Sequence, residues 1–200
     1  MIKNNTSKSK ESSILQLISE AGMLKRVERS GWSVLGIKNA ESVADHSFRC
    51  SVIGYVLSRM EGIPPYKTLV MTMFNDIHEA RITDLHKMAQ RYVKVEGAED
   101  TSFREQVGSL PPDMKNELLG LRVEYRKQKT KESIVARDAD ILECLIQAKE
   151  YMEHGFKEAS KFMKKAPRFL ETRSARSLWR LAKRKKLNDW WFELTEFTRL

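Results

Sequence analysis

The chain has 200 residues, of which 41% are hydrophobic and 32% charged, and its formal net charge at pH 7 is +9. This length and composition are typical of one ordinary globular domain, and no apolar run approaches the roughly 18 residues of a membrane span. Residues 1–13 are polar and lack the apolar segment of a signal peptide, so we expect a cytoplasmic protein without a membrane partner, with these residues as a disordered tail before a domain at residues 14–200.

The N-terminal half predicts three helices separated by Gly and Pro. Apolar residues at 14–24 indicate a first helix, which is followed by a break at Ser30–Trp32. Residues 41–60 repeat apolar side chains at helical spacing, and the glycine and prolines at 62–65 end that helix. The apolar pattern at 69–82 predicts a third helix.

The C-terminal half is also helical in pattern. Residues 97–100 are predicted to form a loop, and Pro111 and Pro112, followed by Asp113, indicate a helix start. The strongest apolar face follows at 132–151, and 178–192 gives a last helical stretch. Because no strand alternation persists, the predicted fold class is all-α, with a single helical domain.

Cysteines and basic residues constrain the compartment and the partners. Cys50 and Cys144 each lie in an apolar helical pattern, which favours buried thiols in a reducing compartment. Lys and Arg cluster at 161–165, 173–180 and 183–186. A nucleic-acid surface is one interpretation, but a solvated helical face is favoured because no aromatic residues interleave with these runs. Nucleic acid is therefore not the expected partner.

Polar side chains interrupt three of the predicted apolar helices. A charged group beside a buried face costs several kcal/mol unless it is paired or bound to a metal. Any one of these residues alone is better explained as a core histidine, a cap or half of a salt bridge. Together, imidazole and carboxylates on three helices favour one shared divalent cation. The residues are Asp45 and His46 in the second helix, Asn75, Asp76, His78 and Glu79 in the third, and Asp138, Asp140 and Glu143 at 132–151.

In this order, these segments resemble the motifs of the HD-domain 5'-deoxynucleotidases, and the resemblance covers roughly residues 14 to 195. Each motif alone is weak, but their order and helical context make the signal specific. The matching segments are LKRVERSGW at 24–32, ESVADHS at 41–47, NDIHE at 75–79, TD at 83–84, DADILE at 138–143 and QAKEY at 147–151.

The resemblance implies a single HD-type helical bundle that forms a homodimer and binds a divalent metal, which is Mn, Co, Fe, Zn or Mg. By position, the metal ligands are His46, the pair Asn75 and Asp76, and Asp140. The implied substrate is a deoxynucleoside 5'-monophosphate or a similar small phosphoester.

The resemblance also implies a catalytic pair and two substrate-binding residues. Glu79 lies three residues beyond Asp76, on the same helix face, and is expected to orient the attacking water or take its proton. Asp84 is expected to position the water or protonate the leaving 5'-oxygen. Arg29 is expected to hold the phosphate through its planar fork, and Trp32 to stack on base or sugar, although a core position is at least as typical of a tryptophan at such a break.

Two positions depart from the family pattern. The first residue of the His-Asp pair is Asn75, whose amide oxygen is a weaker ligand for a transition metal than imidazole. The site is therefore expected to bind metal poorly, to prefer Mg or Mn, or to be empty, and His78 is a less favoured substitute ligand. Thr83 replaces a glycine at a turn that uses a glycine-type dihedral. Lys87 and Arg91 are better explained as solvated charges than as phosphate ligands.

The leading hypothesis for the function is a metal-dependent phosphohydrolase that removes the 5'-phosphate from deoxynucleoside monophosphates. The alternative is a non-catalytic HD-fold nucleotide-binding or regulatory protein with a degraded metal site, which Asn75 favours. A nucleic-acid-binding helical protein is a third hypothesis and depends only on net charge. Retention of the other acidic residues favours the enzyme.

Overall fold

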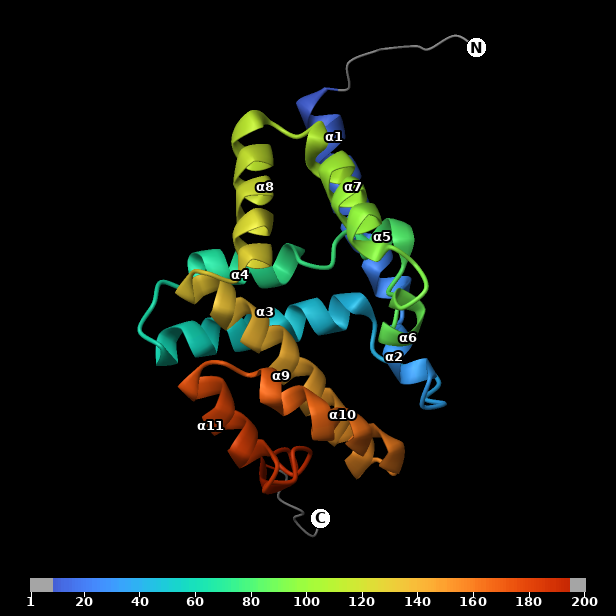
Figure 1. Ribbon diagram of the computed structural model, residues 1–200, viewed down its shortest axis with the longest axis vertical. Helices are drawn as coiled ribbons and strands as arrows, with labels where there is room; N and C mark the ends of the chain where they lie inside the picture. Colours follow the sequence, from blue (N-terminus) through green and yellow to red (C-terminus); the bar gives the residue numbers. More distant parts are fainter. Residues whose placement is uncertain (1–8, 195–200) are drawn as a thin grey trace, which may run out of the picture.

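The computed structural model describes residues 9–194, and most of this range is helical (Figure 1). The only β pairing among these residues is an isolated bridge between Glu28 and Ser42, so the all-α prediction is confirmed. The elements are α1 Lys10–Met23, η1 Leu24–Arg26, α2 Ser30–Ser33, α3 Val43–Met60, α4 Tyr66–Phe74, α5 Glu79–Ile82, α6 Lys87–Gln90, α7 Val95–Gly108, α8 Pro112–Lys127, α9 Lys131–Glu153, η2 Lys157–Ala159, α10 Ser160–Lys165, η3 Ala166–Phe169, α11 Arg173–Ala182 and η4 Phe192–Leu194.

Helices α3, α4 and α9 pack on one another at the centre of the molecule (Figure 1). The two longest of these helices begin with capping boxes. Ser42 and Asp45 exchange hydrogen bonds at the start of α3, and Thr130 and Ser133 do so at the start of α9. These contacts satisfy backbone N–H groups that the first helical turn leaves free. Asp45 is therefore a cap, and His46 follows it in a fixed position on α3.

Two apolar clusters hold the outer helices against this centre. Leu57 of α3 and Leu142 of α9 belong to a core that α11 completes with Trp179. A second core joins α1 and the start of α3 to α7 and α8, and it includes Phe103. Ile77 belongs to this second core, so the segment between α4 and α5 is anchored from the side of α7.

Three boundaries differ from the sequence prediction. The predicted helix at 69–82 is interrupted, because α4 ends at Phe74 and a turn at 75–78 precedes α5. The predicted loop at 97–100 was wrong. These residues lie inside α7, where burial of Val95 and Phe103 outweighs the low helix propensity of glycine. The last helical stretch ends earlier than predicted, at Ala182.

The N-terminal boundary also differs from the prediction. Helix α1 begins at Lys10, with Ser9 as its cap, so residues 10–13 belong to the first helix. The remainder of the predicted tail, residues 1–8, lies outside the described residues. None of the helices within 9–194 is both long and apolar enough to cross a membrane. Cys50 is buried, Cys144 is partly buried, and both are free thiols.

The first prediction concerns the ion pair that joins α1 to α5. Arg81 donates to both carboxylate oxygens of Glu20 at 2.8 Å, and this contact lowers the pKa of Glu20 from 4.5 to about 2. The ionised carboxylate therefore stabilises the fold above pH 4.5, and this contribution is lost as the pH falls toward 2. We expect Glu20→Gln to lower the free energy of unfolding by roughly 1 kcal/mol at pH 7, measured by denaturant titration.

The difference between wild type and Glu20→Gln should close as the pH falls through this window. Glu105→Gln is the matched control, because Glu105 also contacts Arg81 but its side chain is 64% exposed. A difference that stays constant down to the lowest pH would show that ionisation of Glu20 does not stabilise the fold.

Candidate active site

The structure brings three of the predicted metal ligands together from three parts of the chain. His46 comes from α3, Asp76 from the turn at 75–78 and Asp140 from α9. The Nε2 atom of His46 lies 3.2 Å from Asp140 Oδ1 and 3.5 Å from Asp76 Oδ2. Arg29 approaches the same carboxylate, with Nη1 3.6 Å from Asp76 Oδ2. His46 is 1% exposed, so these groups meet in a buried position.

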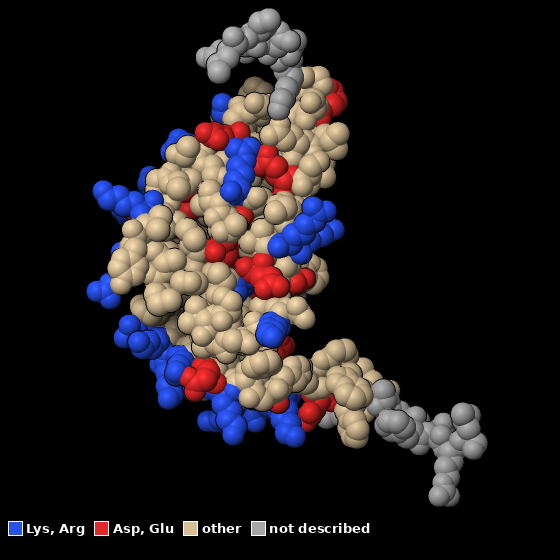
Figure 2. Space-filling view, turned by 90° about the vertical axis from the view of Figure 1, so that its right-hand side faces the viewer, with Lys and Arg blue, Asp and Glu red and all other residues tan. Residues whose placement is uncertain are grey.

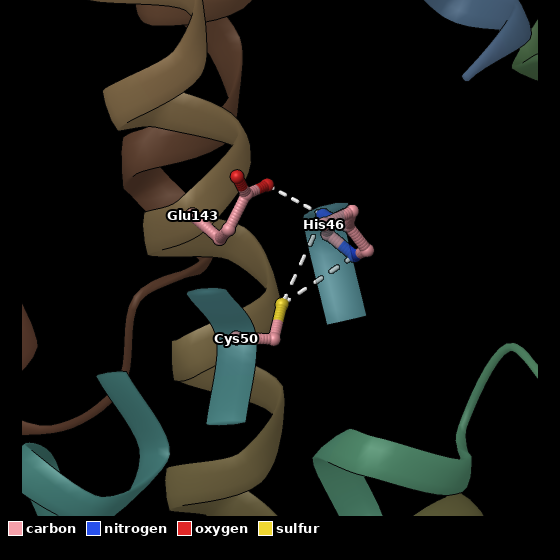
Figure 3. Close-up of side chains that lie close together, drawn as sticks. All are labelled: His46, Cys50 and Glu143. Carbon is pink, nitrogen blue, oxygen red and sulfur yellow. Dashed lines mark hydrogen bonds and ion pairs between the residues drawn. The ribbon is translucent and has the colours of Figure 1, made fainter. Parts of the chain in front are cut away.

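The other nitrogen of His46 is held by Glu143. Nδ1 lies 2.5 Å from Glu143 Oε2 (Figure 3), and the second carboxylate oxygen accepts hydrogen bonds from Arg49 Nη2 at 2.7 Å and Nε at 2.9 Å. Burial alone would raise the pKa of Glu143, but His46 and Arg49 outweigh it and lower that pKa. Glu143 is thus an ionised carboxylate that fixes the ring orientation and turns Nε2 toward Asp76 and Asp140.

A second arrangement of ligand atoms surrounds the same imidazole. Atoms of His46, Cys50 and Glu143 all lie within 4.8 Å of one another, close enough to hold a metal ion (Figure 3). Glu143 already accepts from both Arg49 and His46, however. Burial raises the pKa of Cys50 to about 12, which favours the neutral thiol over the thiolate that binds metals. The donor chemistry therefore favours the Nε2 side of the ring for a cation.

Two carboxyl groups on the Nε2 side, those of Asp76 and Glu79, lack enough nearby positive charge to offset their burial. At Asp140, by contrast, His46 and Arg137 outweigh burial and lower the pKa. Burial raises the pKa of Asp76, against the influence of His46 and Arg29. Burial, with the nearby carboxylates Asp76 and Asp84, raises the pKa of Glu79 to about 10. The Oε2 atom of Glu79 is buried and has no hydrogen-bond partner among the described residues. A divalent cation with a bound water would supply both the missing charge and the missing partner.

The distances also suit a shared ion. A cation with ligand bonds of about 2.0–2.2 Å holds adjacent ligand atoms roughly 3 Å apart, as His46 Nε2 and Asp140 Oδ1 are. Asn75 has a different contact. Its Nδ2 atom donates to Asp76 Oδ1 at 2.6 Å, so the amide orients its neighbour's carboxylate. The residues present thus fit a metal with one imidazole and two carboxylates as protein ligands.

His78 does not take the place of the missing histidine. Its Nε2 atom lies 4.0 Å from Glu99 Oε1 of α7, and its ring is 5% exposed. Burial and the charge of Arg122 lower the pKa of His78 to about 4, so the ring is neutral. Its charged neighbours belong to α7 and α8, away from His46.

Asp84 is held by the residue that follows Arg29. Its Oδ2 atom accepts from the Ser30 backbone N–H at 2.7 Å and from Ser30 Oγ at 3.3 Å. Thr83 precedes it with φ 63° and ψ 168°, a region that is almost restricted to glycine. The glycine-type dihedral expected at this turn is therefore present, although the residue is threonine.

The ring of Trp32 is packed among other aromatic side chains and is not exposed for stacking on a base. It is 2% exposed, its Nε1 donates to Glu41 Oε1 at 2.8 Å, and its ring lies 5.1 Å from Tyr151 and 4.7 Å from Phe162 between centroids. This packing argues against stacking on a base. Substrate binding by Trp32 stays a prediction, and the structure favours support of the cavity wall.

A cavity of about 1400 Å³ is lined by many of these side chains, including Arg29, Asp76, Glu79, Asp84 and Asp140. Sequence reasoning missed Arg137, which lines this cavity and donates to Asp140 Oδ2 at 3.2 Å. Its place three residues before Asp140 puts it on the same face of α9, and this spacing was the available signal. Other basic residues line the cavity as well, including Lys87 and Arg91, for which solvated positions were expected.

The turn at 75–78 is supported from α7 and α8. Side chains of these two helices donate hydrogen bonds to three of its carbonyl groups, two of which also accept backbone N–H groups. Arg122 Nη1 donates to Asn75 O at 3.3 Å, Gln106 Nε2 to Ile77 O at 3.0 Å and Ser102 Oγ to His78 O at 3.3 Å. These contacts fix the segment that carries Asp76 and leads into Glu79.

The sequence profile of the family described as HD domain matches residues 21–179, most of the chain. The chain belongs to the HD-domain family. The resemblance to this family is thereby confirmed, and with it the assignment of the chain as a hydrolase. HD-domain hydrolases are metal-dependent, which agrees with the possible metal ligands that surround His46 in this structure.

Relatives and solved structures agree with this membership. The 5'-deoxynucleotidase HDDC2 of Homo sapiens is 30% identical over 146 residues, covering 71% of this HD-domain chain and 71% of the human protein. HDDC2 of Dictyostelium discoideum is 29% identical over 149 residues, covering 70% of this chain and 78% of that protein. A conserved hypothetical protein from Pyrococcus furiosus has a TM-score of 0.74 at 35% identity, covering 86% of this chain and 99% of that chain.

A more distant structure shares the fold alone. A protein from Magnetospirillum magnetotacticum, described as a predicted metal-dependent phosphohydrolase, has a TM-score of 0.71 at 20% identity, covering 92% of this HD-domain chain and 95% of that chain.

The second prediction concerns the support of the turn. Gln106 and Gln16 both donate to Glu20, at 2.9 and 2.8 Å, but Gln106 also holds the carbonyl of Ile77. We expect Gln106→Met to weaken Mn²⁺ binding by about tenfold, because loss of a supporting contact misplaces Asp76. Calorimetric titration measures this affinity. Gln16→Met is the matched control and should bind the metal as the wild type does. Equal affinities in the two variants would contradict a positioning role for Gln106.

Proposed function

We propose that the chain removes the 5'-phosphate from deoxynucleoside monophosphates. The observation that carries the proposal is the contact of His46 with Asp76 and Asp140 beside a cavity that Arg29 and Glu79 line. The buried Oε2 atom of Glu79 has no hydrogen-bond partner among the described residues. Relatives at about 30% identity that are named 5'-deoxynucleotidases support this substrate class. Incubation of the purified protein with deoxynucleoside 5'-monophosphates and a divalent metal, with release of phosphate as the readout, tests the proposal.

The metal would be held by His46, Asp76 and Asp140, and when bound it supplies positive charge that acidifies a water and neutralises phosphoryl oxygens. Glu79 stands beside this group with a free carboxylate oxygen, and it would orient the attacking water and accept its proton. In the absence of added positive charge its pKa is about 10. A neighbouring cation lowers that pKa and favours the carboxylate that can act as a base.

Arg29 and Asp84 have complementary roles in this proposal. Burial alone would lower the pKa of Arg29, but Asp76 and the other carboxylates outweigh it and raise that pKa, so the guanidinium keeps its charge. It would bind the phosphate, and Arg137, on the neighbouring wall, would add a second guanidinium. Asp84 is fixed by Ser30 and would position the water or protonate the leaving 5'-oxygen.

The donor set bears on which metal is bound. With Asn75 in place of a second imidazole, the protein offers one nitrogen and two carboxylates, and harder cations favour oxygen ligands. We therefore propose Mn²⁺ or Mg²⁺ ahead of Co²⁺, Fe²⁺ or Zn²⁺. The same residue supports a second candidate function, a nucleotide-binding regulatory protein without a metal, since the Asn75 amide contacts Asp76. Metal analysis of the purified protein separates the two candidates.

A homodimer is the assembly that we propose. The exposed side of α3 carries an apolar stripe at helical spacing, formed by Phe48, Val52, Tyr55 and Val56, with exposed fractions from 39% to 67%. A twofold axis across this helix would place the stripe against its own copy, as symmetric dimers require. The two free thiols are consistent with the cytoplasmic location that we also propose.

The third prediction tests the base. Glu79→Gln keeps the shape of the side chain but removes its basicity, so the turnover number should fall at least on the order of 10²-fold while substrate binding persists. Steady-state kinetics on deoxynucleoside 5'-monophosphates measure the turnover number and the Michaelis constant. Arg29→Ala is the contrasting variant and should mainly raise the Michaelis constant. Full turnover by Glu79→Gln would remove this residue from the mechanism.

The fourth prediction restores the absent imidazole. Asn75→His should tighten Co²⁺ or Zn²⁺ binding by one or two orders of magnitude, because imidazole is the stronger donor to these metals. Competition with a chelating dye measures the affinity independently of activity. If the wild type already holds a full equivalent of tightly bound metal, Asn75 matters less than proposed. A variant that binds no more metal and stays inactive would favour the non-catalytic function.

The fifth prediction tests the dimer. Val52→Glu places a charge in the middle of the α3 stripe and should convert the dimer to a monomer, because burying an unpaired carboxylate costs several kcal/mol. Light scattering after size exclusion gives the mass. Leu15→Glu is the control, since Leu15 is 63% exposed on α1 and lies outside the stripe. A wild-type protein that is monomeric at micromolar concentration would exclude this dimer.

A further inference from the structure

The positive charge of the chain is concentrated near its C-terminal end. Residues 157–186 contain twelve Lys and Arg and two Glu, a net charge of +10, whereas the whole chain carries +9. The rest of the chain is therefore nearly neutral. Figure 2 shows Lys and Arg gathered over the lower end of the molecule, where Figure 1 places α10 and α11.

The packing of α11 turns its basic side chains outward. Ala175 and Trp179 of this helix are buried in the core against α9. Arg173 and Arg180 of α11, and Arg184 two residues beyond its end, are exposed, and no ion pair involves them among the described residues. These three arginines therefore carry charge that no acidic side chain of residues 9–194 neutralises by contact.

Large apolar side chains are exposed directly beside this basic face. Leu181 on α11 is 52% exposed, and the turn that follows the basic run leaves Trp190 67%, Trp191 50% and Leu194 75% exposed. Single exposed apolar residues are ordinary, but four large ones beside unpaired basic residues mark an interaction surface. The partner must therefore be anionic and must also accept apolar side chains.

We propose that the basic face of α10 and α11, with the apolar tip at 190–194, binds the surface of an anionic phospholipid membrane. Phosphate and carboxylate headgroups match the unpaired basic residues, and tryptophan side chains occupy the membrane–water interface. Leu181 and Leu194 favour acyl chains over nucleic acid, because leucine has no ring to stack on a base. This contact lies on the surface and spans nothing, so it revises the expectation of no membrane partner, which depended on the absence of a spanning segment.

Vesicle sedimentation tests the proposal. The full chain is mixed at 150 mM salt with phosphatidylcholine vesicles containing about 30% phosphatidylserine, or with neutral vesicles. The protein should bind the anionic vesicles, bind neutral ones far less, and dissociate as salt rises. Arg173→Glu/Arg180→Glu/Arg184→Glu should lower the partition coefficient at least about 100-fold, since each of the three basic residues near the surface contributes about fivefold. Thermal melting checks that this variant is folded.

A control with the same charge change separates location from net charge. Lys10→Glu/Lys25→Glu/Arg104→Glu alters exposed residues on α1, η1 and α7, away from α10 and α11 (Figure 1), and should keep most of the binding. Tryptophan fluorescence gives a second readout. Trp32 and Trp179 are 2% and 3% exposed, so a blue shift on binding reports Trp190 and Trp191.

Three results would overturn the proposal. The first is equal binding by the two triple variants, and the second is an absence of binding to anionic vesicles at 150 mM salt. The third is retention on single-stranded DNA or RNA, lost in the α11 variant, by a protein that ignores the vesicles. That result would assign the face to nucleic acid instead.

Discussion

The contact between His46 Nδ1 and the Glu143 carboxylate determines how the rest of the site is arranged. Because Nδ1 of His46 is bound to Glu143, the other ring nitrogen, Nε2, faces Asp76 and Asp140. Arg49 holds Glu143 from its other oxygen, so the carboxylate cannot turn without losing hydrogen bonds. Because α3 and α9 are packed against each other and each begins with a capping box, the helices that carry this contact are fixed relative to one another. The orientation of one imidazole thus depends on the central packing of the bundle.

The interruption between α4 and α5 gives up regular hydrogen bonding at the place where the chemistry is expected. A continuous helix would point Asp76 and Glu79 along one face at fixed spacing. The turn allows both side chains to line the cavity, and Gln106 and other side chains of α7 and α8 donate to its carbonyl groups. Helices α7 and α8 supply no proposed metal ligand, but they help to fix the position of the turn that carries Asp76.

The sequence pattern predicted the helical class, and polar residues on three apolar helices indicated a shared partner. The resemblance to the HD-domain family then singled out His46, Asp76 and Asp140 among them. The sequence pattern did not predict the turn at 75–78, since the apolar pattern continues through Ile77 and the support comes from residues far away in the chain. The burial of Trp32 depends on Phe162, which is equally distant. The hydrophobic periodicity of a sequence shows which side of a helix is apolar. The turn at 75–78 and the burial of Trp32 depend instead on side chains from segments far away in the chain.

The backbone at Thr83 has a consequence for how this protein would respond to selection. A β-branched residue in a conformation that glycine adopts freely costs of the order of 1–3 kcal/mol, which is a large share of the net stability of a domain. The surrounding contacts, including the one between Asp84 and Ser30, hold the chain in this conformation. A single substitution of Thr83 by glycine should therefore raise the thermal stability of the protein. Directed evolution for survival at higher temperature would be expected to recover glycine at this position early and to leave the cavity residues unchanged.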